Sequence, residues 1–148
     1  MFFREAQPED IKQLHEVRMS VRENVLSDPA LITATQYEEF LTLRGKGWLC
    51  ENGDCIVGFA IVDLTTYNIW ALFIKPEYEG KGIGKKLQNI MLNWYFNRTK
   101  QPIWLDTSPN TRAEIFYRSY GWKETGKQPN GEIKFKLTFD DWKNKYAI

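Results

Sequence analysis

Apolar residues recur at helical spacing in several stretches of the chain. The most regular stretch runs from Gly82 to Phe96, and its apolar positions fall at i, i+4, i+7, i+8 and i+11. These positions are Ile83, Leu87, Ile90, Met91 and Trp94. Three shorter helices are predicted from weaker versions of this spacing and from their caps. They are a helix opened by Pro8-Glu9-Asp10, a short helix capped by Thr35, and a helix from Thr111 to Tyr120.

Apolar runs bounded by turn residues predict strands between these helices. Two runs are almost continuously apolar, from Cys55 to Leu64 and from Asn68 to Ile74, which is typical of strands buried on both faces. The other strands are Phe2 to Glu5, Gly47 to Glu51, Pro102 to Asp106, Trp122 to Thr125 and Glu132 to Phe139. The order βααβββαβαββ, without a linker or repeat, predicts one mixed α/β domain over residues 1–148.

Composition supports a globular fold and argues against one class of function. Hydrophobic residues make up 43% of the 148 positions and charged residues 26%, which excludes an intrinsically disordered chain. Lys and Arg number 20 against 19 Asp and Glu, so the net charge is only +1. A nucleic-acid-binding domain normally carries a larger basic excess, and we therefore expect no nucleic-acid partner.

Signals for export, membrane insertion and metal binding are weak. The first residues reach the acidic Glu5 without the basic flank or apolar run of a signal peptide. The longest unbroken apolar run, Ile69 to Ile74, is far shorter than the about 20 residues that span a bilayer. Two Cys and one His cannot supply four zinc ligands without carboxylates. We expect a cytoplasmic protein with no membrane partner and no metal, and with His15 on the surface of the first helix.

The two cysteines flank a predicted hairpin turn. Asn52-Gly53 between apolar runs indicates a two-residue turn, which would place Cys50 directly opposite Cys55 on the paired strands. This arrangement allows two interpretations. The pair either forms a redox-sensitive cross-strand disulfide or consists of two half-buried thiols that the cytosol keeps reduced.

A glycine-rich loop between a buried strand and the most regular helix carries candidate chemistry. The strand Ile69 to Ile74 runs into Gly80, Gly82 and Gly84, and the helix begins there. Glycines bring backbone N–H groups close to a ligand, and a helix N-terminus adds unpaired donors and partial positive charge. The loop therefore suits a phosphate or pyrophosphate, with cations from Lys81, Lys85 and Lys86 around it.

Other readings of this loop are a plain strand-to-helix turn, a dinucleotide-binding motif and a Walker loop. The spacing G-x-G-x-G differs from the G-x-G-x-x-G of dinucleotide-binding domains. The Walker loop also fails, because no Gly-Lys-Ser/Thr follows the glycines. A second motif elsewhere in the chain decides between the turn and the phosphate site.

That second segment, from Asp106 to Trp122, contains a short strand end and an Asn-led helix that leaves through Gly-Trp. Together the two segments resemble the GNAT superfamily of acyl-CoA-dependent N-acyltransferases. The pyrophosphate loop of that family reads Arg/Gln-x-x-Gly-x-Gly/Ala, and Glu79 to Gly84 is similar to it except at its first position. The family's later pattern, Asn-x-x-Ala-x-x-Phe/Leu-Tyr-x-x-x-Gly-Phe, is matched from Asn110 to Trp122, with Trp in place of Phe.

The resemblance implies a mostly antiparallel mixed sheet flanked by helices, with acetyl-CoA as co-substrate. The cofactor-binding residues that it implies are Leu72, Phe73, Ile74, Glu79, Gly80, Lys81, Gly82, Ile83, Gly84, Lys85, Asn110, Phe116 and Tyr117. Residues 72–74 would offer backbone groups to the pantetheine arm, and residues 80–85 would surround the pyrophosphate. Tyr117 matches the family's tyrosine, which acts as the general acid for the departing thiolate.

Two departures from the family pattern affect the predicted site. Glu79 stands where the family has Arg or Gln, and its negative charge should weaken phosphate binding. The strand Asn68 to Ile74 contains no carboxylate, although some family members carry a general base there. Asp63 and Asp106 at strand ends are the alternatives, together with a base that acts through a chain of waters.

The implied reaction is transfer of an acetyl group from acetyl-CoA to a primary amine of a small molecule or peptide, by direct attack in a ternary complex. The alternative is an acyl-CoA-binding module without turnover, which would have no need of the Tyr117 hydroxyl. In the family the first two helices usually wall the acceptor pocket, here Met19 to Arg44. This segment is compatible with amino acids, polyamines or a peptide terminus, and the resemblance is also compatible with a homodimer.

Overall fold

The computed structural model describes residues 1–145, which form two compact units. The first unit extends from Met1 to Met91, and the second begins at Leu92. Helix α3 (Ile83–Phe96) starts in the first unit and ends in the second. The sequence prediction of a single domain over residues 1–148 stays a prediction, and each unit is described by itself below.

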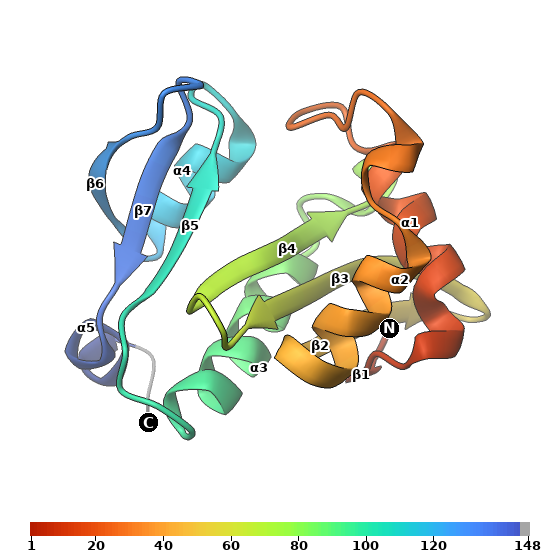
Figure 1. The fold of residues 1–148 in the computed structure, drawn as a ribbon, viewed down its shortest axis with the longest axis horizontal. Helices are drawn as coiled ribbons and strands as arrows, with labels where there is room; N and C mark the ends of the chain where they lie inside the picture. The colour runs from red at the N-terminus through yellow and green to blue at the C-terminus, as the bar shows by residue number, and fades with distance from the viewer. Residues whose placement is uncertain (146–148) are drawn as a thin grey trace. The chain divides into compact units, whose positions relative to one another are not determined.

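The first unit is a four-stranded antiparallel sheet with helices packed on it (Figure 1). Its strands, in spatial order, are β1 (Phe2–Glu5), β2 (Gly45–Asn52), β3 (Cys55–Asp63) and β4 (Asn68–Ile74). Its helices are α1 (Ile11–Ser20), preceded by a 3-10 turn at Pro8–Asp10, and α2 (Ala34–Glu39), which continues into a π-helical segment at Phe40–Arg44. A short 3-10 turn at Pro29–Leu31 lies between the two helices.

The centre of this unit is strand β3. Every residue of β3 after Cys55 is buried, as its continuous apolar run predicts. Strand β4 instead mixes buried and half-buried positions. Of the two strands predicted to be buried on both faces, β3 is buried in this way within the first unit and β4 is not. Leu14 and Val17 of α1 are fully buried, and they join Phe59 and Ile61 of β3 in the core.

The start of α2 differs from its prediction by two residues. Thr33, and not Thr35, is the N-cap residue. The Thr33 hydroxyl accepts a hydrogen bond from Gln36 N at 3.2 Å, and the Gln36 side chain accepts from Thr33 N at 2.8 Å. This reciprocal capping box at Thr33 satisfies two backbone donors at once.

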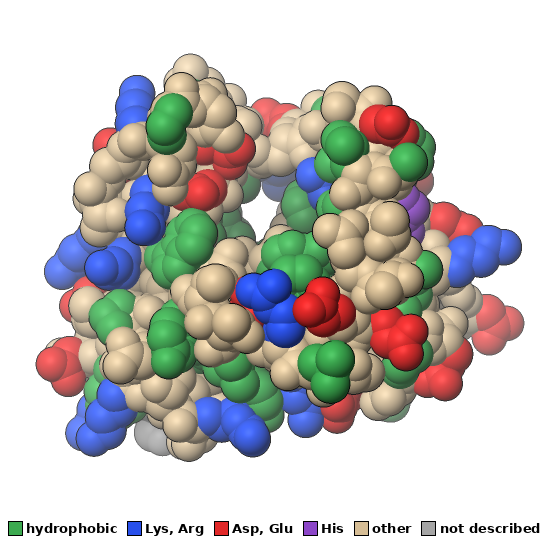
Figure 2. All heavy atoms as spheres, viewed as in Figure 1, with side chains coloured by type: hydrophobic (Ala, Val, Ile, Leu, Met, Phe, Trp, Pro, Cys, Tyr) green, Lys and Arg blue, Asp and Glu red, His purple; other side chains and the backbone are tan. Residues whose placement is uncertain are grey.

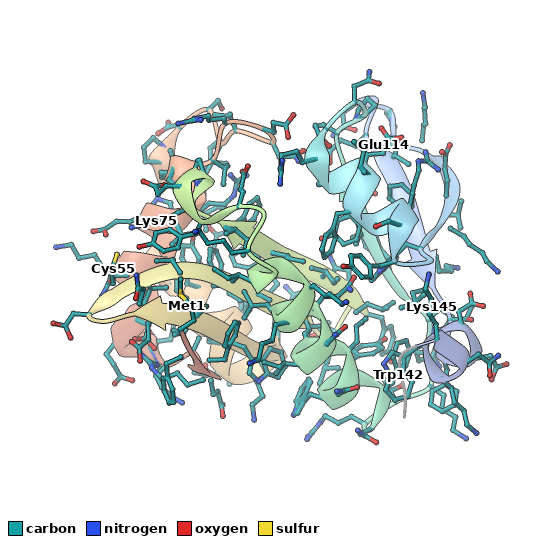
Figure 3. All side chains as sticks on the ribbon, turned by 180° about the vertical axis from the view of Figure 1, so that it is seen from behind. Met1, Cys55, Lys75, Glu114, Trp142 and Lys145 are labelled. Carbon is teal, nitrogen blue, oxygen red and sulfur yellow. The ribbon has the colours of Figure 1, made fainter. Side chains whose placement is uncertain are left out.

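The hairpin between β2 and β3 corrects the predicted cysteine pairing. Asn52 pairs with Cys55, so the turn residues are Gly53 and Asp54, and Cys50 lies opposite Gly58 beyond a register shift. The turn moves by one residue because only Gly53 has the positive φ that it requires. Cys50 is buried and Cys55 is exposed, and neither forms a disulfide. The Cys55 thiol instead lies 3.3 Å from the Lys75 ammonium (Figure 3).

The second unit contains a three-stranded antiparallel sheet with β7 in its centre. Its elements after α3 are β5 (Ile103–Thr107), α4 (Arg112–Ser119), β6 (Lys123–Lys127), β7 (Ile133–Leu137) and α5 (Phe139–Lys145). The sequence pattern does not predict α5, because the apolar alternation of β7 continues to Phe139. Thr138 ends that run, since its hydroxyl accepts from Asp141 N at 3.1 Å at the start of the helix.

The α/β fold class predicted from the sequence is confirmed, with antiparallel strand pairs and flanking helices in both units. Among the residues described, no helix is both long and apolar enough to cross a membrane.

Candidate functional site

The predicted phosphate loop leaves the end of β4 through a tight turn. Lys75 N continues the β3–β4 pairing by donating to Val57 O at 2.8 Å. A 3-10 turn at Pro76–Tyr78 follows, and Glu79 N donates to Pro76 O at 3.2 Å. Gly80 and Gly82 then adopt φ values of +73° and +82°, which side chains rarely tolerate. A Cβ at either glycine would meet no atom within 4 Å, so the space beside both is open.

Helix α3 begins directly after these glycines. Gly82 O accepts the first helical hydrogen bond, from Lys86 N at 3.1 Å. The N–H groups of Ile83 and Gly84 therefore have no intrahelical acceptor and are available to an anion, with the helix dipole in support. The Ile83 side chain is buried over Gly58 of β3, where a Cβ would come within 3.3 Å of it. This packing fixes the helix start relative to the sheet.

The structure places the predicted cofactor residues of the first unit along one continuous path. Leu72, Phe73 and Ile74 are half-buried at the end of β4, where they pair with Ala60, Phe59 and Gly58 of β3. The loop residues Glu79, Gly80, Lys81, Gly82 and Lys85 are exposed. The half-buried strand end, the exposed glycines and the helix start are therefore consecutive, as a ligand with an apolar arm and a pyrophosphate requires.

Asn110 lies in the second unit, in a conformation that a neighbouring carboxylate stabilises. Its φ is +61°, in the left-handed region, and its backbone N–H donates to Glu114 Oε1 at 2.7 Å. Thr111 caps α4 by accepting from Glu114 N at 3.2 Å. The hydrogen bond from Asn110 N, followed by the one from Arg118 Nε, holds the pKa of Glu114 below its usual value. The sequence analysis did not single out Glu114, which projects from α4 (Figure 3), although the pattern Thr-x-x-Glu indicates it.

Tyr117 is held within the second unit by aromatic rings. Its ring lies 5.2 Å from that of Phe116, 5.4 Å from Trp122 and 6.2 Å from Phe135. Burial raises the pKa of Tyr117, so the phenol stays protonated at neutral pH. Its hydroxyl forms no hydrogen bond within residues 1–145. The group is therefore a neutral acid whose proton is not engaged elsewhere in the part of the chain that is described.

The Gly-Trp exit of α4 explains how the sequence positions Tyr117. Gly121 has a φ of +87°, and its N–H donates to Arg118 O at 3.2 Å. Trp122 N donates to Tyr117 O at 3.0 Å, which completes the hydrogen-bond pattern of a Schellman motif. The buried Trp122 ring is thereby brought back onto Tyr117.

Asp63, the first candidate base, is engaged in a structural network. Its two carboxylate oxygens accept from Arg44 Nη2 at 2.6 Å, Arg44 Nε at 3.3 Å, Thr65 N at 2.8 Å and Thr66 Oγ1 at 2.7 Å. Burial opposes its ionisation, but the hydrogen bonds from Thr66, Arg44 and Thr65 outweigh this effect and lower its pKa. Four donors leave this carboxylate little capacity to accept a substrate proton.

Asp106, the second candidate base, has a more accessible position. It is exposed on β5 opposite Lys134, and its oxygens accept from Gln128 Nε2 at 3.1 and 3.4 Å. A single neutral donor on the carboxylate leaves acceptor capacity for another group.

The predicted acceptor wall, residues 19–44, is ordered around a buried tyrosine. Tyr37 is 1% exposed, and its hydroxyl forms a hydrogen bond with His15 Nδ1 at 2.9 Å. His15 is therefore half-buried and tied to α2, which corrects its prediction as a surface residue. Burial raises the pKa of Tyr37 to about 12. Phe40 stacks on Trp70 at 4.1 Å between ring centroids.

The predicted site residues are thus divided between the two units. Residues 72–85 belong to the first unit, and Asn110, Phe116 and Tyr117 belong to the second. On the face shown in Figure 2, Lys and Arg side chains lie among Asp and Glu side chains.

Comparisons with known proteins point to one family. The family described as Acetyltransferase (GNAT) matches residues 10–122. The [ribosomal protein bS18]-alanine N-acetyltransferase of Haemophilus influenzae is 30% identical over 97 residues, which are 64% of this chain. The match spans 63% of that relative's length.

Two solved structures are similar over nearly the whole chain. The ribosomal-protein-S18-alanine N-acetyltransferase of Escherichia coli superposes with a TM-score of 0.74 at 15% identity, over 93% of both chains. The PaiA N-acetyltransferase of Thermoplasma acidophilum, solved in complex with coenzyme A, gives a TM-score of 0.79 at 16% identity, over 93% of this chain and 98% of that one. At these identities the likeness shows the fold.

Proposed function

Because the chain belongs to the acetyltransferase (GNAT) family, whose members are acyltransferases, we propose that it transfers an acetyl group from acetyl-CoA to a primary amine of a small molecule or peptide. The observation that carries this proposal is the loop from Glu79 to Gly84. Its two left-handed glycines border open space, and the N-terminus of a 14-residue helix follows them directly. The solved neighbour that contains coenzyme A supports the identity of the co-substrate.

In the proposed reaction the cofactor is bound mainly by the backbone. Residues 72–74 receive the pantetheine arm, residues 80–85 surround the pyrophosphate, and Asn110 and Phe116 also contact the cofactor. Backbone N–H groups donate to phosphate oxygens regardless of side chain, which makes the replacement of Arg or Gln by Glu79 tolerable.

The chemistry needs an unprotonated amine and a proton for the leaving group. An alkylammonium with a pKa of about 10.4 is almost fully charged at neutral pH, so Asp106 or a chain of waters removes its proton. The amine nitrogen then attacks the thioester carbonyl, the C–N bond forms and the C–S bond breaks. Tyr117 donates its phenolic proton to the departing thiolate, which leaves as CoA thiol. The second proton, which the attacking nitrogen loses as it becomes an amide, returns directly or through water to the Tyr117 oxygen.

The test is acetyl transfer to a panel of primary amines. The panel contains free amino acids, polyamines and peptides, including one that begins with alanine because of the relative named for alanine acetylation. Release of CoA thiol is measured together with the mass of the acetylated product. We expect both signals to require enzyme and amine. Binding of acetyl-CoA without transfer to any amine would instead favour the non-catalytic module.

A further inference from the structure

Arg18 is a half-buried cation on α1 and has no ionic partner among the described residues. Its guanidinium carbon lies 4.2 Å from the ring centroid of Phe73 on β4. The Nη1 atom is buried and has no hydrogen-bond partner within residues 1–145. Buried polar atoms in proteins are nearly always hydrogen-bonded, so such an exception needs an explanation, which strain, an ordered water, an ion or a functional role can supply.

Other arginines of the protein show the usual arrangement. Arg4 pairs with Asp10 and Glu51, at 2.9 and 3.1 Å, and Arg44 pairs with Asp63 at 2.6 Å. Arg18 has no carboxylate partner among residues 1–145, and the Tyr37 hydroxyl is close enough to interact with its charge. Carboxylates therefore balance the charges of the half-buried Arg4 and Arg44, whereas no carboxylate of the described residues balances the charge of Arg18.

The environment of Arg18 makes the missing partner costly. Burial lowers the pKa of the guanidinium, but arginine remains charged at any physiological pH. The Phe73 ring offers only a cation–π contact, which is weaker than a carboxylate pair with two hydrogen bonds. The geometry of the guanidinium fits a carboxylate, because its planar N–H donors match the two carboxylate oxygens.

We propose that Arg18 binds a carboxylate of the substrate, and that the acceptor amine carries it. This inference rests on the proposed function, since Phe73 is one of the residues assigned to the pantetheine arm. A carboxylate beside Phe73 would accept from N–H groups of the guanidinium and orient the amine toward the thioester. This carboxylate site distinguishes between acceptor classes that the sequence left open. An amino acid supplies the anion that Arg18 would bind, whereas a polyamine brings only further positive charge.

The test compares Arg18→Gln with the wild type on matched acceptors. Each acceptor is offered as an amino acid and as its α-amide, for example L-phenylalanine and L-phenylalaninamide, with acetyl-CoA as donor. The amino acid and its amide differ in the pKa of the amine. This difference is the same for both enzymes, so it cancels when the acid-to-amide ratio of kcat/KM in Arg18→Gln is divided by the same ratio in the wild type. We expect kcat/KM to fall about 10- to 100-fold for the acid and about threefold or less for the amide, from loss of a charged hydrogen bond.

A second set of measurements, in which the acyl donor is varied, identifies whether the carboxylate belongs to the donor or to the acceptor. Succinyl-CoA and acetyl-CoA are compared with the amide acceptor, for the wild type and Arg18→Gln. A selective loss with succinyl-CoA would place the carboxylate on the donor and overturn the assignment to the acceptor. An equal loss in all combinations, or wild-type transfer to polyamines alone, would overturn the carboxylate site itself.

Controls separate this site from folding and from the proposed function. Lys12→Gln removes an exposed charge from the same helix and should leave every ratio unchanged. Arg18→Lys keeps the charge without the planar fork and should recover only part of the loss. Calorimetric binding of N-acetyl-L-phenylalanine and its amide, with CoA present, needs no turnover. Arg18-dependent binding of the acid without any transfer would support the site and contradict the proposed function.

Discussion

Arg44 Nη2 lies 2.6 Å from Asp63 Oδ2, and this ion pair fastens the end of β3 to the residue that precedes β2. The same two residues are joined through the backbone, because Leu64 N donates to Arg44 O at 2.8 Å. The Asp63 side chain is 2% exposed and that of Arg44 is 29% exposed. The pair is thus a structural element of the first unit.

We expect Asp63→Asn to reduce stability and to leave the chemistry intact. Removing one member of a buried pair costs about 3 kcal/mol, at the lower end of the usual range because Arg44 keeps some solvent contact. The measurement is urea unfolding, and Asp54→Asn, at an exposed turn position, is the matched control with an effect within about 0.5 kcal/mol. A large fall in kcat at temperatures where Asp63→Asn stays folded would show instead that Asp63 is the base.

The same carboxylate should contribute to the acid dependence of stability. Its pKa is lowered in the folded state, so its contribution is present above the unfolded pKa of about 3.9 and is lost as pH falls toward the folded value. Asp63→Asn should therefore flatten the acid side of the stability–pH curve. An unchanged slope below pH 4 would contradict this assignment.

Gly82→Val should abolish CoA binding. The substitution introduces a β-branched residue at a φ of +82° and fills the open space in which the pyrophosphate is proposed to lie. Gly131→Val is the matched control, since Gly131 has a φ of +90° and equally open surroundings in the turn before β7. Both should lose stability from backbone strain, but only Gly82→Val should lose calorimetric affinity for CoA. Equal affinities in the two variants would place the pyrophosphate elsewhere.

Glu79→Gln should tighten CoA binding modestly. It removes a negative charge from the proposed phosphate loop, and exposed charges contribute little, so we expect about two- to fivefold at low salt. The gain should shrink as salt screens the charges. Glu77→Gln, in the 3-10 turn two residues earlier, should change the affinity less. If Glu79→Gln weakens binding at every ionic strength, the side chain organises the loop.

The helix and loop around Gly82 were predictable because local rules determine them. The 3.6-residue period from Ile83 to Trp94 and the glycines before it leave few alternatives for the backbone. Two predictions were wrong, the turn of the β2–β3 hairpin and the first residue of α2, because neighbouring residues compete for the same local role. The hairpin register depends on which single residue takes a positive φ. The start of α2 depends on which of two threonines forms the capping box, because Thr33 with Gln36 and Thr35 with Glu38 both fit its pattern.

Long-range partners could not be predicted in the same way. His15 and Tyr37 are 22 positions apart, and no local pattern indicates that their side chains meet. The pairing of Asp63 with Arg44 likewise depends on the packing of helices on the sheet. So does the lack of a hydrogen-bond partner for Arg18 Nη1 in the described part of the chain. Function classes followed from motifs, whereas these roles of individual polar residues required the three-dimensional structure.

Tyr117→Phe tests the proposed general acid. The substitution keeps the ring that packs against Phe116, Trp122 and Phe135, and it removes only the hydroxyl. Burial raises the pKa of Tyr117, so the proton that the mechanism needs is present across the neutral range. We expect kcat to fall at least about tenfold with acetyl-CoA affinity nearly unchanged, because loss of a general acid commonly costs about 10²–10⁴-fold in rate.

Tyr120→Phe supplies the control, since it deletes a hydroxyl from the other tyrosine at the end of the same helix, outside the proposed site. If Tyr117 only packs against the cofactor, acetyl-CoA affinity would fall and kcat would not. A kcat near that of the wild type in Tyr117→Phe, measured where the chemical step limits turnover, would reject the general-acid role. The ring contacts persist in this variant, so a loss of kcat alone can only come from the missing proton donor.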